Sequence, residues 1–193
     1  MACTLANKLT LSRILVIPVI VTLFYLPFSW SHAAAAFFFV VGCVTDWLDG
    51  FVARRFKQTS SLGILLDPIA DKLIVATCLV LLVHKYQNIF MVIAAIVIIG
   101  REIAIAGLRE WLRQTTQKTQ KNLAVSVAGK IKTLLQMVAI ALLLIAPFPY
   151  LPYQQYQQWI GYGVLCLAVV LTLYSMAHYL KTALYDTEQV DRN

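Results

Sequence analysis

The chain has 193 residues, of which 60% are hydrophobic and only 13% carry a charge. A soluble domain has roughly 25% charged residues, so this chain has too few polar groups to cover a water-exposed globule of its size. The composition therefore excludes an ordinary soluble domain and predicts an integral membrane protein.

Six apolar stretches predict six transmembrane helices, because a membrane span needs about 20 mainly apolar residues. The first and the fifth stretch are short unless their neighbours extend them, as residues 9–11 and 124–128 do. We therefore expect an all-α bundle of six helices, with residues 1–193 forming a single domain. In chain order the six stretches are residues 14–28, 33–53, 62–83, 89–108, 131–146 and 159–180.

The positions of Lys and Arg predict how this bundle is oriented. With a cytoplasmic N-terminus, the outer loops are residues 29–32, 84–88 and 147–158, and among sixteen Lys and Arg residues only Lys85 falls in them. The positive-inside rule therefore places both termini in the cytoplasm. The net charge of +7 then describes one membrane face that meets anionic lipids, and not a nucleic-acid site. A cleavable signal peptide is the alternative for the first stretch, but cleavage would delete one helix and spoil this charge bias.

Four aspartates lie in the second and third apolar stretches, at their cytoplasmic ends: Asp46, Asp49, Asp67 and Asp71. Ionisable groups in membrane segments are costly and usually face a bundle interior or a wet cavity. On a helix, Asp49 lies three residues after Asp46 and Asp71 lies four residues after Asp67, so each pair shares one face. The intervening segment RRFKQTSS predicts a cytoplasmic turn between antiparallel neighbours, so the two pairs are expected to converge.

Converging carboxylates need counter-charges, because four of them in a small volume repel one another. Two divalent cations cancel their four formal charges, and oxygen ligands without thiols suit Mg²⁺ or Mn²⁺. Arg54 lies one residue beyond the face of Asp46 and can reach a phosphate with its planar fork. A pair of divalent metals beside an arginine is typical of phosphoryl transfer. The sequence therefore predicts a metal site that holds a diphosphate.

These residues resemble the signature of a known family, the CDP-alcohol phosphatidyltransferases. All eight signature positions are present, as Asp46-x2-Asp49-Gly50-x2-Ala53-Arg54-x8-Gly63-x3-Asp67-x3-Asp71. The resemblance implies transfer of a phosphatidyl group from CDP-diacylglycerol to an alcohol, with release of CMP, at the cytoplasmic face of a bacterial inner membrane. It also implies two bound divalent cations, Mg²⁺ or Mn²⁺, and a homodimer as a further expectation.

The same resemblance assigns roles to individual residues. Asp46, Asp49, Asp67 and Asp71 are implied to be the metal ligands, and Asp71 also the base that takes the proton of the acceptor. A metal ion ordinarily lowers the pKa of a neighbouring carboxylate, but it also acidifies a bound hydroxyl, which reduces the demand on that base. The residues implied to contact CDP-diacylglycerol are Gly50, Arg54, Ser60 and Asn7.

Shorter segments favour glycerol 3-phosphate as the acceptor: NKLTLSR at residues 7–13, REIAIAGLRE at 101–110 and GKIKT at 129–133. An anionic acceptor needs cations near the metal site, and Arg101 and Arg109 lie about 80° apart around a helix, where both can border one pocket. Lys130 and Lys132 differ by about 200°, so at most one faces inward. We favour Lys130 and expect Lys132 to extend along the membrane interface as a snorkelling cation. Glu102 and Glu110 are candidates to balance these charges, without a catalytic task.

Several alternatives stay open at this point. Serine, inositol phosphate or another phosphatidylglycerol could replace glycerol 3-phosphate as the acceptor. A divalent-cation transporter would carry polar groups through the full membrane depth, and a prenyltransferase would show two separated Asp-rich motifs on a longer chain. For the lipid donor we expect a lateral opening between helices near the inner leaflet, flanked by apolar side chains. The sequence does not identify the helices that form it.

Overall fold

The computed structural model describes residues 5–56, 61–115, 127–149 and 153–190, and side chains within 14–45, 69–70, 72–108, 131–149, 153–177 and 179. In these backbone segments the chain forms six α-helices and no strand. The prediction of an all-helical chain with six helices is therefore confirmed. The helices are α1 (Leu5–Tyr25), α2 (Ser31–Phe56), α3 (Ser61–Tyr86), α4 (Ile89–Thr115), α5 (Val127–Ile145) and α6 (Gln154–Val190).

Several helices are longer than the apolar stretches that predicted them. α4 continues to Thr115, seven residues past the end of its apolar stretch, and α6 runs from Gln154 to Val190. The polar segment YDTEQV, which lies beyond the last apolar stretch, is thus the last part of α6. Hydropathy marks the part of a helix that lies in lipid, whereas backbone hydrogen bonding continues through polar residues where no helix breaker intervenes.

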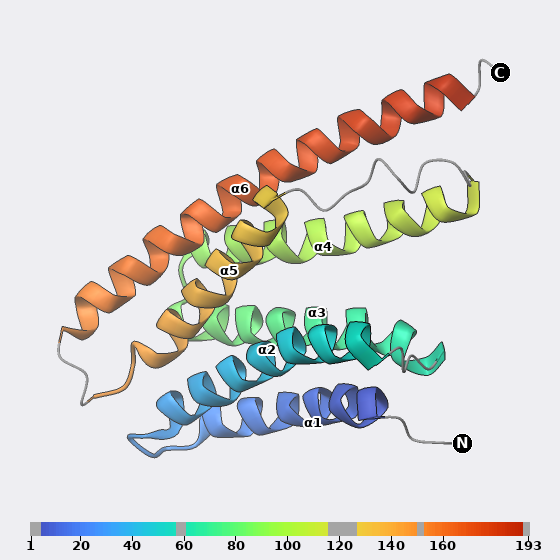
Figure 1. The fold of residues 1–193 in the computed structure, drawn as a ribbon. Coiled ribbons are helices and arrows are strands. Elements are labelled where there is room, and N and C mark those ends of the chain that lie inside the picture. Colours follow the sequence, from blue (N-terminus) through green and yellow to red (C-terminus); the bar gives the residue numbers. More distant parts are fainter. Residues whose placement is uncertain (1–4, 57–60, 116–126, 150–152, 191–193) are drawn as a thin grey trace.

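Successive helices run in alternating directions along one bundle, so that the start of α1 and the end of α6 lie at the same end (Figure 1). We call this end the signature end, because α2 finishes there at Phe56 and α3 begins there at Ser61. α1 packs against α2 and α3, and α4 packs against α3 and α6. α5 contacts α2, α3 and α6, so it lies between the first and last parts of the chain.

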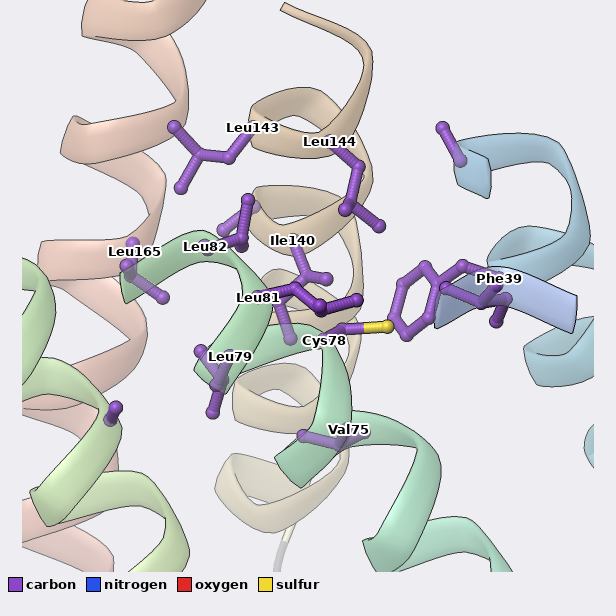
Figure 2. Close-up of a cluster of buried hydrophobic side chains, with 14 of the residues drawn as sticks. Phe39, Val75, Cys78, Leu79, Leu81, Leu82, Ile140, Leu143, Leu144 and Leu165 are labelled. Carbon is purple, nitrogen blue, oxygen red and sulfur yellow. The ribbon is translucent and has the colours of Figure 1, made fainter. Parts of the chain in front are cut away.

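An apolar core fills the half of the bundle away from the signature end. Figure 2 shows it as side chains from α2, α3, α5 and α6, with Cys78 on α3 directed toward Phe39 on α2. The fully buried large residues in this region include Phe39, Leu79, Leu82, Ile140, Leu143 and Leu165. Close packing of this kind fixes neighbouring helices relative to one another. The buried polar residues Lys132 and Gln136 lie nearer the signature end, earlier along α5 than this core.

Two helices contain described segments long and apolar enough to cross a membrane, Ile89–Leu108 in α4 and Gln154–Ala177 in α6. In α4, a stripe of isoleucines faces outward at Ile89, Ile93, Ile96 and Ile103, each more than half exposed. The opposite face of this helix is buried and equally apolar, with Met91, Ala94, Ala95 and Ile98. A helix that is apolar on all sides is typical of a membrane span. Shorter apolar segments are Ile14–Tyr25, Ser31–Thr45 and Ile131–Ile145.

Candidate active site

The four signature aspartates lie on two neighbouring helices, with Asp46 and Asp49 on α2 and Asp67 and Asp71 on α3. These helices contact each other and run in opposite directions, as the turn between them predicted. Ser60 lies outside the described residues. The side chains of other predicted site residues lie outside the described part as well: Asn7, Asp46, Asp49, Arg54, Asp67, Asp71, Arg109 and Lys130.

α2 and α3 approach each other closely at Gly42, one turn from the aspartates. A Cβ atom added at Gly42 would lie 2.9 Å from the Cδ1 atom of Ile74 on α3, closer than real Cβ atoms approach a neighbour. Gly42 lies four residues before Asp46, and Ile74 lies three residues after Asp71. Because the helices are antiparallel, one turn from this contact toward the signature end leads to Asp46 on α2 and to Asp71 on α3.

Helical spacing extends the buried faces of both helices to the aspartate positions. On α2, Phe39 and Gly42 are buried, and position 46 follows them by seven and four residues. On α3, Ile74 and Cys78 are buried, and position 71 precedes them by three and seven residues. Residues with these spacings share one helix face. Two helices that meet along such faces suit a set of four carboxylate ligands, the donor type that Mg²⁺ and Mn²⁺ prefer.

Substitution of Gly42 by Leu is expected to lower the turnover number about 100-fold. Ile74 is only 2% exposed, so it has little room to move, and the larger side chain would push α2 away from α3. A shift of about 1 Å at reacting groups can cost about 100-fold in rate. The measurement is the rate at which the purified variant releases CMP, the product that the resemblance implies.

The matched control for Gly42→Leu is Gly163→Leu on α6. A Cβ at Gly163 meets nothing within 4 Å, so the same added side chain should leave the rate unchanged. A folded Gly42→Leu variant with the wild-type rate would show that the close approach of α2 and α3 does not set the site.

A cluster of polar and charged side chains, the Glu102 cluster, joins four helices. Arg101 and Glu102 come from α4, Lys132 from α5, Lys72 from α3 and Ser175 from α6. Glu102 Oε1 accepts hydrogen bonds from Arg101 Nη1 at 2.6 Å and from Lys132 Nζ at 3.4 Å. Lys72 Nζ donates to the main-chain carbonyl of Glu102 at 3.2 Å, and Arg101 Nη2 donates to Ser175 Oγ at 3.5 Å.

Lys132 corrects one expectation from the sequence. Only 3% of this residue is exposed, and its amine is paired with Glu102, so it does not extend along the membrane interface. Its aliphatic stem points into the bundle because the face of α5 that carries Lys132 also carries the buried Gln136, one turn later. Lys130 lies about 200° around the helix from Lys132, and its side chain is not among those described.

The Glu102 cluster holds more positive than negative charge. It contains three cations and one carboxylate among the described side chains, and Arg101 and Lys132 are largely shielded from solvent. Within the described part of the chain, Arg101 Nε is buried without a hydrogen-bond partner, as is Thr172 Oγ1, one turn before Ser175 on α6. Buried charge is costly unless it is paired and hydrogen-bonded. The arrangement therefore suits a bound anion.

Sequence reasoning missed three members of this cluster: two cations, Lys72 and Lys132, and the hydroxyl of Ser175. Lys72 directly follows Asp71, so a cation next to the predicted base was visible in the segment ADK. Lys132 was set aside because only one of two lysines was expected to face inward, and periodicity alone did not say which. Arg101, the candidate ligand for the acceptor phosphate on α4, contacts Glu102, in agreement with the charge balance that we expected.

A cavity of about 220 Å³ opens between α3, α4 and α5 beside the Glu102 cluster. Its walls are mainly apolar, and polar groups enter it from Lys72, Glu102, Thr133 and Gln136. A second hollow of about 470 Å³ lies between α2 and α5, and only apolar side chains and Cys43 line it. Both hollows combine two features expected of a lateral opening, apolar walls and a position between helices.

Comparison with known proteins identifies the family. The profile of the CDP-alcohol phosphatidyltransferases matches residues 3–174, which include all eight signature positions. The chain belongs to the CDP-alcohol phosphatidyltransferase family. The resemblance inferred from the aspartate pattern is thereby confirmed, and the family is one of enzymes.

Three relatives bear the name CDP-diacylglycerol--glycerol-3-phosphate 3-phosphatidyltransferase. The protein of Pseudomonas fluorescens is 43% identical over 177 residues, which cover 92% of this chain and 88% of that protein. The proteins of Escherichia coli (strain K12) and Shigella flexneri serotype 5b are each 43% identical over 186 residues, covering 96% of this chain and 98% of theirs. Similarity to these family members thus extends over almost the whole chain.

Proposed function

We propose that this protein transfers the phosphatidyl group of CDP-diacylglycerol to the 1-hydroxyl of sn-glycerol 3-phosphate, giving phosphatidylglycerol phosphate and CMP. The name shared by the relatives supports this reaction. One observation in the structure carries the proposal: the aspartate signature and a buried cluster of cations meet on α3, where Lys72 follows Asp71 and reaches Glu102. In the proposal, the site for the diphosphate lies next to a site for a second anion.

In the proposed reaction, Asp46, Asp49, Asp67 and Asp71 hold two divalent cations, Mg²⁺ or Mn²⁺. Bound there, such ions neutralise the diphosphate and acidify a nearby hydroxyl. Asp71 takes the proton of the acceptor hydroxyl. The acceptor oxygen forms a bond to phosphorus of the phosphatidyl group, and the bond from that phosphorus to CMP breaks, with its electron pair leaving on CMP.

The donor and the acceptor occupy different sides of this site in the proposal. Gly50, Arg54, Ser60 and Asn7 contact CDP-diacylglycerol, with the planar guanidinium of Arg54 suited to a phosphate. Arg101 binds the phosphate of the acceptor together with Lys132, which takes the inward position that the sequence assigned to Lys130, and Arg109 borders the same pocket. A phosphate monoester carries about −1.5 to −2 charges at pH 7, close to the excess of two positive charges in the Glu102 cluster.

We place the protein in a bacterial inner membrane with six spans, both termini in the cytoplasm and the site facing the cytoplasm. The charge bias supports this orientation, because Lys85 alone among sixteen Lys and Arg residues falls in the predicted outer loops. The alternating helices and the outward isoleucines of α4 support a multi-pass arrangement. A homodimer belongs to this proposal on the family resemblance alone.

The cavity between α3, α4 and α5 is the proposed lateral opening for the lipid donor. It offers apolar walls to an acyl chain and charged groups, Lys72 and Glu102, near the expected head. We expect Ala76→Phe, which fills this cavity, to raise the KM for a long-chain donor about tenfold. If the phenyl ring excludes about two methylene groups of the acyl chain from the cavity, binding weakens by roughly 1.6 kcal/mol. This free energy corresponds to about a tenfold change in affinity. A donor with short acyl chains should be affected less than about twofold.

The control for Ala76→Phe is Ala141→Phe, which fills the second hollow between α2 and α5. It should leave both donors unaffected. If instead Ala141→Phe alone weakened the long-chain donor, the lipid would enter between α2 and α5. An unchanged KM in a folded Ala76→Phe variant would remove the α3–α5 cavity from the proposal.

The function is tested with purified protein, CDP-diacylglycerol, Mg²⁺ or Mn²⁺, and a panel of labelled alcohols. The panel contains glycerol 3-phosphate, serine, inositol phosphate and phosphatidylglycerol. We expect a labelled lipid with glycerol 3-phosphate alone, formed in equal amount to CMP. A product with serine or inositol phosphate instead would keep the chemistry and change the acceptor. Divalent-cation flux in proteoliposomes without CMP release would support a transporter.

A further inference from the structure

We propose that Glu102 is a positioning residue for the acceptor, which fixes Arg101 and Lys132 in one place and ties them to the helix that carries Asp71. The inference rests on the proposed function, because it explains how the same site binds the phosphate of the acceptor. Glu102 neither touches the reacting atoms nor moves a proton in this proposal. It acts through the two cations that it holds.

The carboxylate of Glu102 brings cations from two helices to one point. Its Oε1 atom lies 2.6 Å from Arg101 Nη1 on α4 and 3.4 Å from Lys132 Nζ on α5. Two positive groups this close to the same oxygen atom repel each other, and an intervening negative charge is what holds them together. The side chains of Arg101 and Lys132 are 9% and 4% exposed, so water screens this repulsion poorly.

The main chain of Glu102 makes a second connection, to α3. Lys72 Nζ donates a hydrogen bond to the Glu102 carbonyl oxygen at 3.2 Å, and Lys72 is the next residue after Asp71. Arg101 in turn reaches Ser175 on α6 at 3.5 Å. Residues 101 and 102 thus connect α4 with α3, α5 and α6. The cations that would hold an acceptor phosphate are fixed relative to the helix that would supply the base.

Glu102 is also placed where it can act on a ligand site. Its side chain is 26% exposed and lines the cavity between α3, α4 and α5, whereas the two cations that it pairs with are more deeply buried. One oxygen of the carboxylate serves both cations, and Arg101 Nε finds no hydrogen-bond partner among the described residues. In the proposal, this N–H group donates a hydrogen bond to the phosphate.

The test uses Glu102→Gln, which keeps the size and the acceptor oxygen of the side chain but removes its charge. We expect the KM for glycerol 3-phosphate to rise about tenfold to 100-fold, with the turnover number and the donor KM changed less than about twofold. Glu102→Asp keeps the charge on a shorter side chain and should recover part of the affinity. Glu188→Gln on α6 makes the same chemical change at a distance along the sequence and should have no effect.

A double variant separates positioning from a general structural role. If Lys132 acts through Glu102, the pair Glu102→Gln and Lys132→Gln should raise the acceptor KM no more than the worse single variant. Equal rises of the donor and acceptor KM, or an unchanged acceptor KM in folded Glu102→Gln, would overturn the inference. If Glu102→Gln does not fold, Glu102→Asp decides: an acceptor KM equal to wild type contradicts the role, and a selective rise supports it.

Failure of this inference is distinguishable from failure of the proposed function. Wild-type protein that makes no lipid from glycerol 3-phosphate would refute the function before any variant is compared. Suppose instead that the wild-type protein turns over glycerol 3-phosphate, but Glu102→Gln does not raise the acceptor KM more than the donor KM. The proposed function would then stand, and Glu102 would have no positioning role in it.

Discussion

Asp71→Asn is expected to lower the rate of CMP release at least about 1,000-fold while leaving a folded protein. The substitution keeps the size of the side chain but removes a negative charge from the proposed metal site and takes away the proposed base. Loss of a general base alone typically costs 10²–10⁴-fold. Asp67→Asn should be similarly inactive through the metal site, although Asp67 has no proposed role in proton transfer.

The control for these two variants is Asp186→Asn, which makes the same chemical change near the end of α6. It should retain the wild-type rate, because position 186 lies outside the aspartate signature. Helix content and the unfolding temperature of all three variants, measured in the same detergent, show whether each is folded. Full activity in folded Asp67→Asn or Asp71→Asn would defeat the assignment of the metal site.

Arg101→Ala is expected to raise the KM for glycerol 3-phosphate about 10- to 100-fold, with a much smaller effect on the KM for CDP-diacylglycerol. A hydrogen bond to a charged group contributes about 1.5–3 kcal/mol, and each 1.4 kcal/mol is a factor of ten. The Arg101 guanidinium is already held by Glu102 and Ser175, so little ordering is needed when a phosphate binds. Steady-state kinetics with each substrate varied in turn provides the measurement.

Arg101→Lys is the companion variant, since it keeps the charge but loses the planar fork. We expect an acceptor KM between those of the wild type and Arg101→Ala. Equal increases of both KM values in Arg101→Ala would remove this residue from the acceptor pocket and indicate a general disturbance of the bundle instead.

The sequence predicted the helices well because apolar segments of sufficient length have one stable form in lipid, the α-helix. All six were found, and the antiparallel pairing of α2 and α3 followed from the short polar turn between them. The family followed from a resemblance, since the residue types and the spacing of all eight positions match the known signature, and the family profile confirms it. These are local properties of the chain.

The Glu102 cluster, which is the proposed acceptor side, could not be predicted in the same way, because it depends on contacts between distant segments. Lys132 pairs with Glu102 across thirty positions of the sequence, and Arg101 reaches Ser175 across seventy-four. Helical periodicity showed that Lys130 and Lys132 face different ways, but only the packing of α5 against α2, α3 and α6 decided which one is buried. The helices around the lateral cavity depend on packing for the same reason.

The ends of the helices could not be predicted from hydropathy, for a different reason. The segment YDTEQV is mostly polar in sequence, yet it continues α6 to Val190. Hydropathy finds where lipid contact stops, and in such a segment the end of the helix depends on backbone geometry and capping instead. A polar sequence beyond a membrane span is therefore weak support for a tail.

Binding of Mn²⁺ to the purified protein tests the central claim most directly, that α2 and α3 together hold two divalent ions. Equilibrium dialysis with metal analysis should find close to two Mn²⁺ ions per wild-type chain and a loss of this binding in the Asp46→Asn, Asp67→Asn double variant. Equal Mn²⁺ binding by the folded double variant and the wild type would contradict the account.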